Sequence, residues 1–213
     1  VNRVRALIRQ WKPDVVYCHS SKGGGIGRLA ALGLGVKVMY NPHGWAFSMK
    51  GSKVKSWIYL MIERTLAHAT DQFVMISNYE KMLAVQRHVG KADRMKVIFN
   101  GVDTENIRKT AALSMISRRD VGIPEDAYVI GMVGRISPQK APDVFVRMAA
   151  EVVKKIPKAW FVIVGDGEQR EDIVNLAKEL GIADRLTITG WTENPIDYMK
   201  LFDQAVLLSR WEG

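Results

Sequence analysis

Short β-rich runs alternate with helical patterns along the whole of this 213-residue sequence. A strand, a helix and a further strand in this order form a parallel sheet, because the helix carries the chain back to the starting edge. We therefore predict an α/β fold with parallel sheets and helices on both of their faces. The predicted strands are Asp14–His19, Val36–Asn41, Gln72–Ser77, Lys96–Phe99, Tyr128–Val133, Trp160–Val164, Arg185–Thr189 and Gln204–Leu208. The predicted helices are Val1–Gln10, Lys22–Gly33, Val54–His68, Tyr79–Val89, Pro142–Ile156, Glu168–Leu180 and Pro195–Leu201.

The alternation is interrupted between Asn100 and Asp126, where no strand-like run occurs. The charge changes at the same place. Residues 1–107 contain 16 Lys and Arg against 7 Asp and Glu, whereas residues 108–213 contain 15 of each class. All of the net charge of +9 therefore lies in the first part. We predict two partial Rossmann-like domains, 1–107 and 127–213, joined by a linker at 108–126.

Composition limits the classes of protein to which the chain can belong. The content of 47% hydrophobic residues is enough for a core, and no apolar run approaches the 18 or so residues of a membrane-spanning helix. The single cysteine, Cys18, excludes an intramolecular disulfide and is typical of a reducing compartment. Excess positive charge suits nucleic acid, an anionic membrane or a phosphorylated ligand. Because no nucleic-acid-binding motif is visible, we expect no nucleic-acid partner.

A glycine-rich stretch, "HSSKGGGIGRLAA", follows the first predicted strand. Glycine-rich turns between a strand and a helix often hold phosphates. The spacing of a dinucleotide-binding motif is absent, because Arg28 stands where its third glycine would be, and the P-loop pattern is absent too. The stretch is then either a tight turn or a place where the backbone comes close to a ligand.

Four predicted strand ends in the second half carry residues suited to a ligand. Open α/β sheets bind ligands at the carboxyl ends of their strands. Two cations near a helix start suit a diphosphate, and glycines permit close approach of a backbone. Each feature alone has a structural explanation, such as a capped helix, a tight turn, a packed tryptophan or a surface acid. Together they predict one site, made by Gly134, Arg135 and Lys140 in "GRISPQK", Gly165 and Gly167 in "GDGEQRE", Gly190 and Trp191 in "GW", and Glu212 in "SRWEG".

These segments resemble a known family. "VGRISPQKAPDVFVRMA", "FVIVGDGEQRE", "ITGW" and "LLSRWEG" are similar to the donor-binding half of family-4 retaining glycosyltransferases with the GT-B fold. "PDVVYCHSSKGGGIGRLAA", "NPHGWAF", "ISNYEK" and "IFNGVD" resemble the acceptor half, especially of capsule and exopolysaccharide members. The resemblance implies a chain shortened at both ends. The opening strands of the acceptor half are missing, and the family's second glutamate would fall eight residues after Glu212, beyond the last residue.

The resemblance also implies roles for individual residues. Arg135 and Lys140 would hold the donor diphosphate and stabilise the leaving nucleotide, Glu212 would contact the sugar, and His43 would lie near the transferred sugar. Glu168 joins the donor set. The acceptor side comprises Ser20, Ser21, Lys22, Gly23, Gly24, His43 and Gly44. The glycine-rich stretch thus belongs to the acceptor rather than to the nucleotide.

The expected activity is transfer of a hexose or N-acetylhexosamine, with retention, to a lipid-linked (polyprenyl diphosphate) glycan. The donor is a nucleotide-diphosphate sugar, for which we expect a UDP-sugar. No D-x-D motif or His/Cys cluster with metal spacing occurs, so we expect neither a metal nor a cofactor. Two alternatives stay open: a sugar-nucleotide epimerase of the same fold, and a non-catalytic sugar-nucleotide-binding fragment.

The segment from Met49 to Leu66 predicts a membrane partner. Lys50, Lys53 and Lys55 precede the apolar run Trp57–Ile62, and such a segment can lie among lipid headgroups without spanning the bilayer. The alternative is that Trp57–Ile62 packs under its own sheet. We expect a cytoplasmic protein that is peripheral at the inner face of the membrane.

Overall fold

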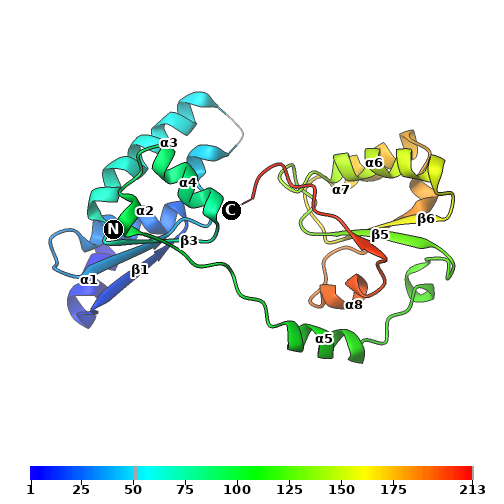
Figure 1. The fold of residues 1–213 in the computed structure, drawn as a ribbon, viewed down its shortest axis with the longest axis horizontal. Coiled ribbons are helices and arrows are strands. Elements are labelled where there is room, and N and C mark those ends of the chain that lie inside the picture. Colours follow the sequence, from blue (N-terminus) through cyan, green and yellow to red (C-terminus); the bar gives the residue numbers. More distant parts are fainter. Residues whose placement is uncertain (50–51, 213) are drawn as a thin grey trace. The chain divides into compact units, whose positions relative to one another are not determined.

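The computed structural model describes residues 1–49 and 52–212 and divides into two compact units, Val1–Gly101 and Val102–Glu212 (Figure 1). Both units consist of a parallel sheet with packed helices. The predicted α/β class with two parallel sheets is confirmed. The first unit ends at Gly101, whereas the boundary predicted from the sequence lies at residue 107.

The first unit has a four-stranded sheet in the order β1-β2-β3-β4, and all neighbouring strands are parallel. Its short 3-10 turns are η1 (Ala46–Ser48), η2 (Ala67–Ala69) and η3 (Ala92–Arg94). Its helices and strands are α1 (Asn2–Trp11), β1 (Val15–His19), α2 (Ser21–Ala31), β2 (Lys37–Asn41), α3 (Lys53–Leu66), β3 (Gln72–Met75), α4 (Asn78–Gln86) and β4 (Met95–Val97).

The glycine-rich stretch forms the N-cap and the whole of helix α2 rather than a loop. Its glycines are there because α2 lies very close to the sheet. A Cβ on Gly24 would stand 2.2 Å from the Tyr40 ring, and a Cβ on Gly27 would stand 2.4 Å from Cys18 Sγ. Cys18 is buried, and this burial raises the pKa of its thiol. The interpretation of the stretch as a tight turn is therefore wrong, although the predicted helix Lys22–Gly33 overlaps α2.

The second unit has a four-stranded parallel sheet in the order β7-β6-β5-β8. Successive residues of the central strand β6 point to opposite faces. Phe161 and Ile163 join a core with helices α6 and α7, whereas Val162 and Val164 join a second core with Phe202. A strand that is buried on both faces is typical of a parallel sheet. The elements are α5 (Thr104–Leu113), η4 (Arg119–Val121), β5 (Tyr128–Val133), α6 (Pro142–Lys155), β6 (Ala159–Val164), α7 (Arg170–Glu179), η5 (Ala183–Arg185), β7 (Leu186–Ile188), α8 (Pro195–Met199) and β8 (Gln204–Ala205).

The segment 108–126, interpreted as a linker from the sequence, packs on the second unit. Helix α5 begins where the Asp103 side chain accepts a hydrogen bond from Asn106 N at 2.9 Å, a strong helix-start signal that did not enter the sequence prediction. Arg118 pairs with Asp203 at 2.9 Å and donates to Ala127 O at 2.8 Å. Ile123 is buried in the core. These contacts tie the second half of the segment to the sheet.

Candidate functional site

The acceptor-side residues lie at the carboxyl edge of the first sheet. His19 ends β1 and is paired in register with Asn41, which ends β2. The Asn41 side-chain oxygen accepts a hydrogen bond from His43 N at 3.1 Å, and the Asn41 carbonyl oxygen accepts one from Ser20 N at 2.9 Å. The structure therefore brings together the loops that carry the predicted Ser20 and His43.

His43 is in contact with a second histidine. Nδ1 of His19 lies 2.8 Å from Nε2 of His43, and both side chains are exposed. His43 has a φ of 50° and Gly44 a φ of 96°. The chain therefore turns sharply here, in a backbone conformation that residues other than glycine rarely adopt. His19 has no role in the sequence prediction, because nothing in the sequence indicates that the ends of β1 and β2 pair in this register.

A buried glutamate holds the His43 loop in place. Glu80 on α4 is 2% exposed, and its two carboxylate oxygens accept hydrogen bonds from Gly44 N at 2.7 Å and Ile76 N at 2.8 Å. Its carbonyl oxygen accepts a bond from Trp45 Nε1 at 3.0 Å. Glu80 is absent from the predicted site. The sequence feature that could have identified it is the Ser77-x-x-Glu80 pattern, which is typical of a helix start. In the structure the Ser77 side chain accepts a hydrogen bond from Glu80 N at 3.0 Å.

The other predicted acceptor-side residues form the start of α2. Ser20 is the N-cap residue with a φ of 59°, and Ser21 begins the helix. Lys22 and Gly23 are exposed, so a ligand at this edge can reach them. Gly24 is buried against Tyr40, and its role is in packing rather than in ligand contact.

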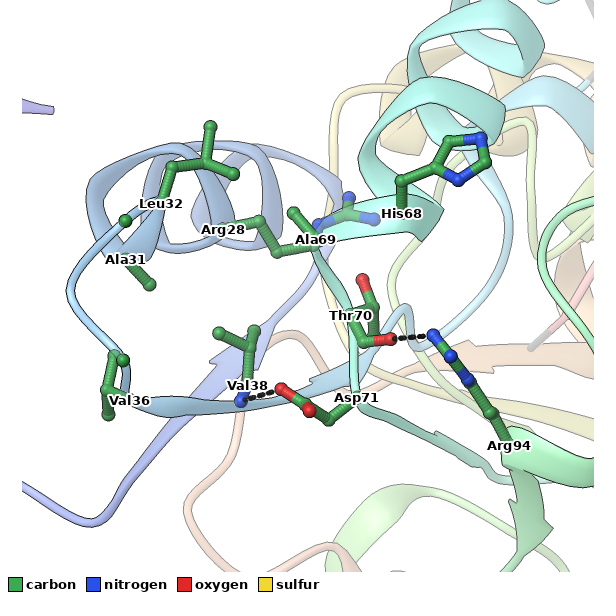
Figure 2. Close-up of a pocket in the computed structure, with 12 residues that line it drawn as sticks. Arg28, Ala31, Leu32, Val36, Val38, His68, Ala69, Thr70, Asp71 and Arg94 are labelled. Atoms are coloured by element: carbon green, nitrogen blue, oxygen red, sulfur yellow. Dashed lines mark hydrogen bonds between the residues drawn. The ribbon is translucent and has the colours of Figure 1, made fainter.

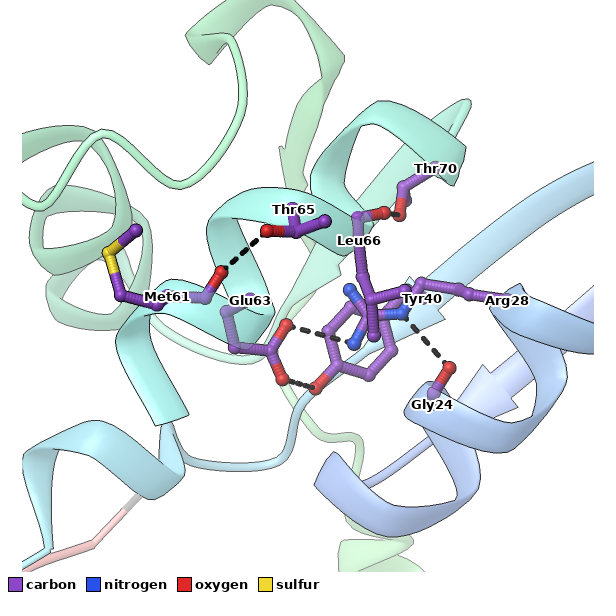
Figure 3. A network of polar contacts seen from close by, with 8 residues as sticks. All are labelled: Gly24, Arg28, Tyr40, Met61, Glu63, Thr65, Leu66 and Thr70. Atoms are coloured by element: carbon purple, nitrogen blue, oxygen red, sulfur yellow. Dashed lines mark hydrogen bonds and ion pairs between the residues drawn. The ribbon is translucent and has the colours of Figure 1, made fainter. Parts of the chain in front are cut away.

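A buried polar network joins α2 to α3 behind this edge (Figure 3). Arg28 pairs with Glu63 at 2.9 Å, donates to Gly24 O at 2.9 Å, and lies 3.8 Å above the ring of Tyr40. The Tyr40 hydroxyl donates to Glu63 at 3.0 Å. Burial raises the pKa of Glu63, and the Arg28 charge offsets only part of that effect. The network fixes the helix that carries Ser20 and Lys22.

A cavity of about 180 Å³ lies at the opposite edge of this sheet, where β2 and β3 begin (Figure 2). Two hydrogen bonds join residues that line it. Asp71 accepts from Val38 N at 2.9 Å, and Arg94 donates to Thr70 O at 3.3 Å. The bond from Val38 N lowers the pKa of Asp71. These pairs indicate that the cavity residues hold β2 and β3 together.

In the second unit, glycines join three strand ends. Gly134 N donates to Val164 O at 2.9 Å, and Gly165 forms a bridge with Gly190. A Cβ on Gly165 would stand 2.1 Å from Gly134 O, and one on Gly167 would stand 2.3 Å from Ile136 O. From the sequence, Gly165 and Gly167 are expected to permit close approach by a ligand. In the structure the close approach is made by the backbone of the preceding loop.

The predicted donor cations are each paired with an acid. Arg135 Nε lies 3.2 Å from Glu168 Oε2, and Lys140 Nζ lies 2.5 Å from Glu212 Oε1. A hydrogen bond from its own backbone N–H and the Arg135 guanidinium lower the pKa of Glu168. Burial pushes the pKa of Glu212 upward, but the hydrogen bonds from Lys140 and Ser209 and the Lys140 charge together outweigh it, so this pKa is lowered.

The arrangement of this edge places Lys140 beside the end of β5. A Cβ built on Gly134 would lie 3.5–3.6 Å from the side-chain carbons of Lys140. Trp191, after β7, is 74% exposed, so it is not a packed tryptophan. The edge therefore presents two cations, two acids and an exposed ring.

Arg210 holds the segment that carries Glu212, and it is absent from the predicted site. Its guanidinium pairs with Asp143 at 2.5 Å and donates to Pro138 O at 2.8 Å. Its backbone N–H donates to Gln139 O at 2.8 Å. The hydrogen bond from Arg210 lowers the pKa of Asp143. The segment "SRWEG" alone does not indicate that Arg210 pairs with Asp143 at the start of α6.

Two further properties concern metals and membranes. Over residues 1–49 and 52–212, no group of three or more His, Cys, Asp or Glu side chains is arranged to hold a metal ion. In the same part of the chain, no helix has both the length and the apolar character that crossing a bilayer requires.

Comparison with known sequences gives matches over nearly the whole chain. The Glycosyltransferase Family 4 model matches residues 1–106, and the Glycosyl transferases group 1 model matches residues 115–213. The UDP-Gal:alpha-D-GlcNAc-diphosphoundecaprenol alpha-1,3-galactosyltransferase of Escherichia coli is 33% identical over 97% of this chain and 54% of its own length. The putative glycosyltransferase EpsD of Bacillus subtilis is 28% identical over 99% of this chain and 56% of its own length. The chain thus spans about half the length of these curated relatives.

Solved structures share the fold. Anabaena HepE, crystallised with UDP, has a TM-score of 0.79 at 20% identity and covers 98% of this chain, which in turn covers 57% of HepE. Sucrose-phosphate synthase of Thermosynechococcus elongatus has a TM-score of 0.77 at 18% identity, with 98% of this chain and 53% of that chain covered. With the two family models and the relatives, these likenesses show that the chain has the GT-B fold and belongs to the family-4 glycosyltransferases.

Proposed function

We propose that this chain carries donor and acceptor elements of an enzyme that moves a hexose or N-acetylhexosamine from a UDP-sugar to a polyprenyl-diphosphate-linked glycan, with retention. The setting is synthesis of a bacterial capsule, exopolysaccharide or other cell-surface polysaccharide. Two names support the proposal: that of the Escherichia coli relative, which includes a UDP-sugar and a diphosphoundecaprenol acceptor, and that of HepE in complex with UDP.

One observation carries the proposal: the pairing of both donor-side cations with carboxylates at the carboxyl edge of the second sheet. The two ion pairs are Arg135 with Glu168 and Lys140 with Glu212. An incoming anionic ligand can displace the carboxylate from each of them. A diphosphate would replace the acids as the partner of the cations. Glu212, released from Lys140, would then accept hydrogen bonds from the sugar hydroxyls.

The same cations serve the chemical step. Cleavage of the bond between the sugar and the diphosphate leaves a negative charge on the departing UDP. Lys140 and Arg135 stabilise that charge, and charge stabilisation of this kind often lowers the barrier of an enzyme reaction more than any other effect. In this proposal the two side chains take the place of a divalent cation. The acceptor hydroxyl attacks the face that UDP leaves, so the anomeric configuration is retained without a covalent intermediate with the protein.

On the acceptor side, the proposal assigns His43 to the sugar being transferred and the start of α2 to the acceptor. Lys22 and the N–H groups at the start of α2 attract anions. No acidic side chain lies in the first turn of this helix to repel an anionic ligand group. Ser20 and Ser21 add hydroxyl groups at the same place.

The exposure of helix α3 supports an anionic membrane surface as a partner. Five apolar residues at helical spacing form one stripe on α3 and are all exposed: Val54, Trp57, Ile58, Met61 and Ile62. The opposite face carries the buried Glu63 and Leu66. The alternative that Trp57–Ile62 packs under its own sheet is wrong for all of these residues except the half-buried Leu60. Lys53 and Lys55 are exposed on α3, and Lys50 lies outside the described residues. A membrane surface at the inner, cytoplasmic face would cover this stripe.

A thermal-shift panel of UDP-, GDP- and ADP-sugars tests the donor assignment with this chain. We expect a UDP-sugar to raise the melting temperature, since a ligand stabilises only the state that binds it. The same sugar should then extend a polyprenyl-diphosphate-linked glycan with retention in the full-length gene product, and EDTA should leave the rate unchanged. Isomerisation of the sugar nucleotide without glycan extension would restore the epimerase alternative, which the transferase relatives do not favour. Binding without turnover would indicate a non-catalytic module.

A further inference from the structure

A groove of about 710 Å³ lies between helices α3 and α4, with η1 at one side. This volume is within the range of small-molecule sites, roughly 300–1,000 Å³. Phe47, Leu60 and Leu83 form its apolar wall; Phe47 is buried in the core of the first unit, and the half-buried Leu60 and Leu83 pack against that core. Trp57 and Tyr79 line its mouth and are 62% and 61% exposed. The groove therefore offers an apolar wall next to the exposed stripe of α3.

The charges around the groove are all positive. Lys53 and Arg87 line it, and no carboxylate does. Within the described ranges, neither cation lies within ion-pair distance of an acid, although eleven other pairs do. An apolar groove with unpaired cations complements a ligand with a hydrocarbon chain and an anionic head.

One end of the groove is tied to the His43 loop. Lys53 and Tyr79 stand where α3 and α4 begin, at the carboxyl edge of the sheet. Glu80, the neighbour of Tyr79, accepts the hydrogen bond from Gly44 N at 2.7 Å. The Ser56 hydroxyl donates to Phe47 O and so fixes η1 against α3. A ligand head at Lys53 would therefore lie on the same edge as His43.

We propose that this groove binds the first isoprene units of the acceptor lipid, with the lipid diphosphate at Lys53 and the glycan directed toward His43. This inference rests on the proposed function and adds a binding site for the lipid part of the acceptor. An isoprenoid chain is a better match than a diacyl phospholipid, because the apolar wall consists of only three side chains and a single hydrocarbon chain covers it. Trp57 joins the groove to the membrane-facing stripe, so the rest of the lipid tail can continue into the bilayer.

Calorimetry with this chain and farnesyl diphosphate, a short water-soluble polyprenyl diphosphate, tests the site. We expect one molecule to bind, with inorganic pyrophosphate at least about tenfold weaker because it lacks the chain. Leu83→Trp, which fills the groove, should weaken binding at least about tenfold, whereas Val85→Trp on the exposed side of α4 should not. Lys53→Ser should weaken binding about tenfold through loss of a charge-assisted bond, whereas Lys55→Ser, which is not in the groove, should not.

Binding of farnesyl diphosphate by Leu83→Trp and Lys53→Ser as tight as by the native protein would overturn the groove assignment. If Leu83→Trp fails to fold, Lys53→Ser alone still tests it. Tighter binding of dodecyl phosphate than of farnesyl diphosphate would overturn the isoprenoid occupant in favour of a membrane lipid. If the full-length gene product transfers sugar to a lipid-linked acceptor and the groove variants transfer it equally well, the groove assignment alone is overturned. Groove binding without transfer from any nucleotide sugar overturns the proposed function alone.

Discussion

Nδ1 of His19 lies 2.8 Å from Nε2 of His43, across the paired ends of β1 and β2. One of the two rings donates the proton in this contact and the other accepts it. Nε2 of His43 is thereby engaged, and Nδ1 is the nitrogen of His43 that a substrate can meet. The backbone of the same loop is held by Asn41 and Glu80. His43 thus has a fixed backbone and a partner for one ring nitrogen.

His43→Ala should reduce sugar transfer by the full-length gene product about a hundredfold, since a positioned histidine typically contributes that much. UDP affinity should change less than about twofold, because His43 lies in the first unit, whereas the cations proposed to bind UDP lie in the second. His19→Ala should give a smaller loss of transfer, because it removes only the partner of His43. Steady-state kinetics and UDP titration check both variants. Full transfer activity in His43→Ala would show that this residue is only structural.

Arg135→Ala and Lys140→Ala should each weaken UDP binding about tenfold to a hundredfold, because each removes a charge-assisted bond to phosphate. The melting temperature of the ligand-free chain should change little for Arg135, whose side chain is 71% exposed. Lys158→Ala is the matched control, since Lys158 also forms an exposed ion pair, with Asp126, but precedes β6 at the other edge of the sheet. Unchanged UDP affinity in Arg135→Ala would refute the assignment.

Gly24→Ala should lower the free energy of unfolding by roughly 1–3 kcal/mol, because the new methyl group overlaps the Tyr40 ring. Tyr40 has no room to move, since it is fully buried and held by Glu63 and Arg28. Gly23→Ala is the control on the same helix. Its methyl group would meet only Ser20 Oγ at 3.7 Å, so it should leave stability unchanged or raise it by about 0.5–1 kcal/mol. Urea unfolding measures both, and equal effects would contradict the packing account.

Local sequence signals predict the strands well, and contacts between distant segments are what they leave out. The strand Tyr128–Val133 is observed at its predicted bounds, and the others differ by a few residues, because β-branched runs and glycine punctuation are local signals. The roles of Gly24, Gly165 and Gly167 were not predictable, because each depends on a neighbour from another segment.

The same limit explains the polar residues that the sequence did not reveal. Glu80 and Arg210 act on backbone groups that lie far away in sequence, and His19 acts on a residue 24 positions later. Motif spacing carries no information about such contacts. The predicted donor cations, in contrast, follow directly from their place after a strand, and the structure gives both of them acidic partners.

Glu63 should make a contribution to stability that falls as pH rises. Its carboxyl has a pKa raised above the ordinary value of 4.5 by burial, so between the unfolded and the folded pKa the native state binds more protons than the unfolded state. Stability from this group is therefore full below pH 4.5 and is lost as pH rises through the folded pKa. The difference in unfolding free energy between the native protein and Glu63→Gln should accordingly shrink from pH 4.5 upward. Urea titrations at several pH values measure it, and a difference that grows with pH would contradict the raised pKa.

Membrane binding through α3 should need both its lysines and its apolar stripe. Each lysine near an anionic surface contributes about 1 kcal/mol, and the exposed Trp57 adds apolar area that water otherwise contacts. In co-sedimentation, we expect the chain to bind vesicles that contain phosphatidylglycerol, and to bind less as salt screens the charges. Lys53→Glu with Lys55→Glu should abolish most of this binding, and Trp57→Ser should reduce it at all salt concentrations.

Matched variants separate this surface from the general basic character of the first unit. Lys91→Glu changes an exposed lysine outside α3 by the same charge, so it should reduce binding far less than a charge reversal at Lys53. Trp11→Ser removes a tryptophan that is 71% exposed on α1 and should have no effect. Equal binding to neutral and anionic vesicles would contradict the electrostatic part of the proposal. Equal losses in the Lys91 and Lys53 variants would show that net charge, rather than the surface of α3, attracts the membrane.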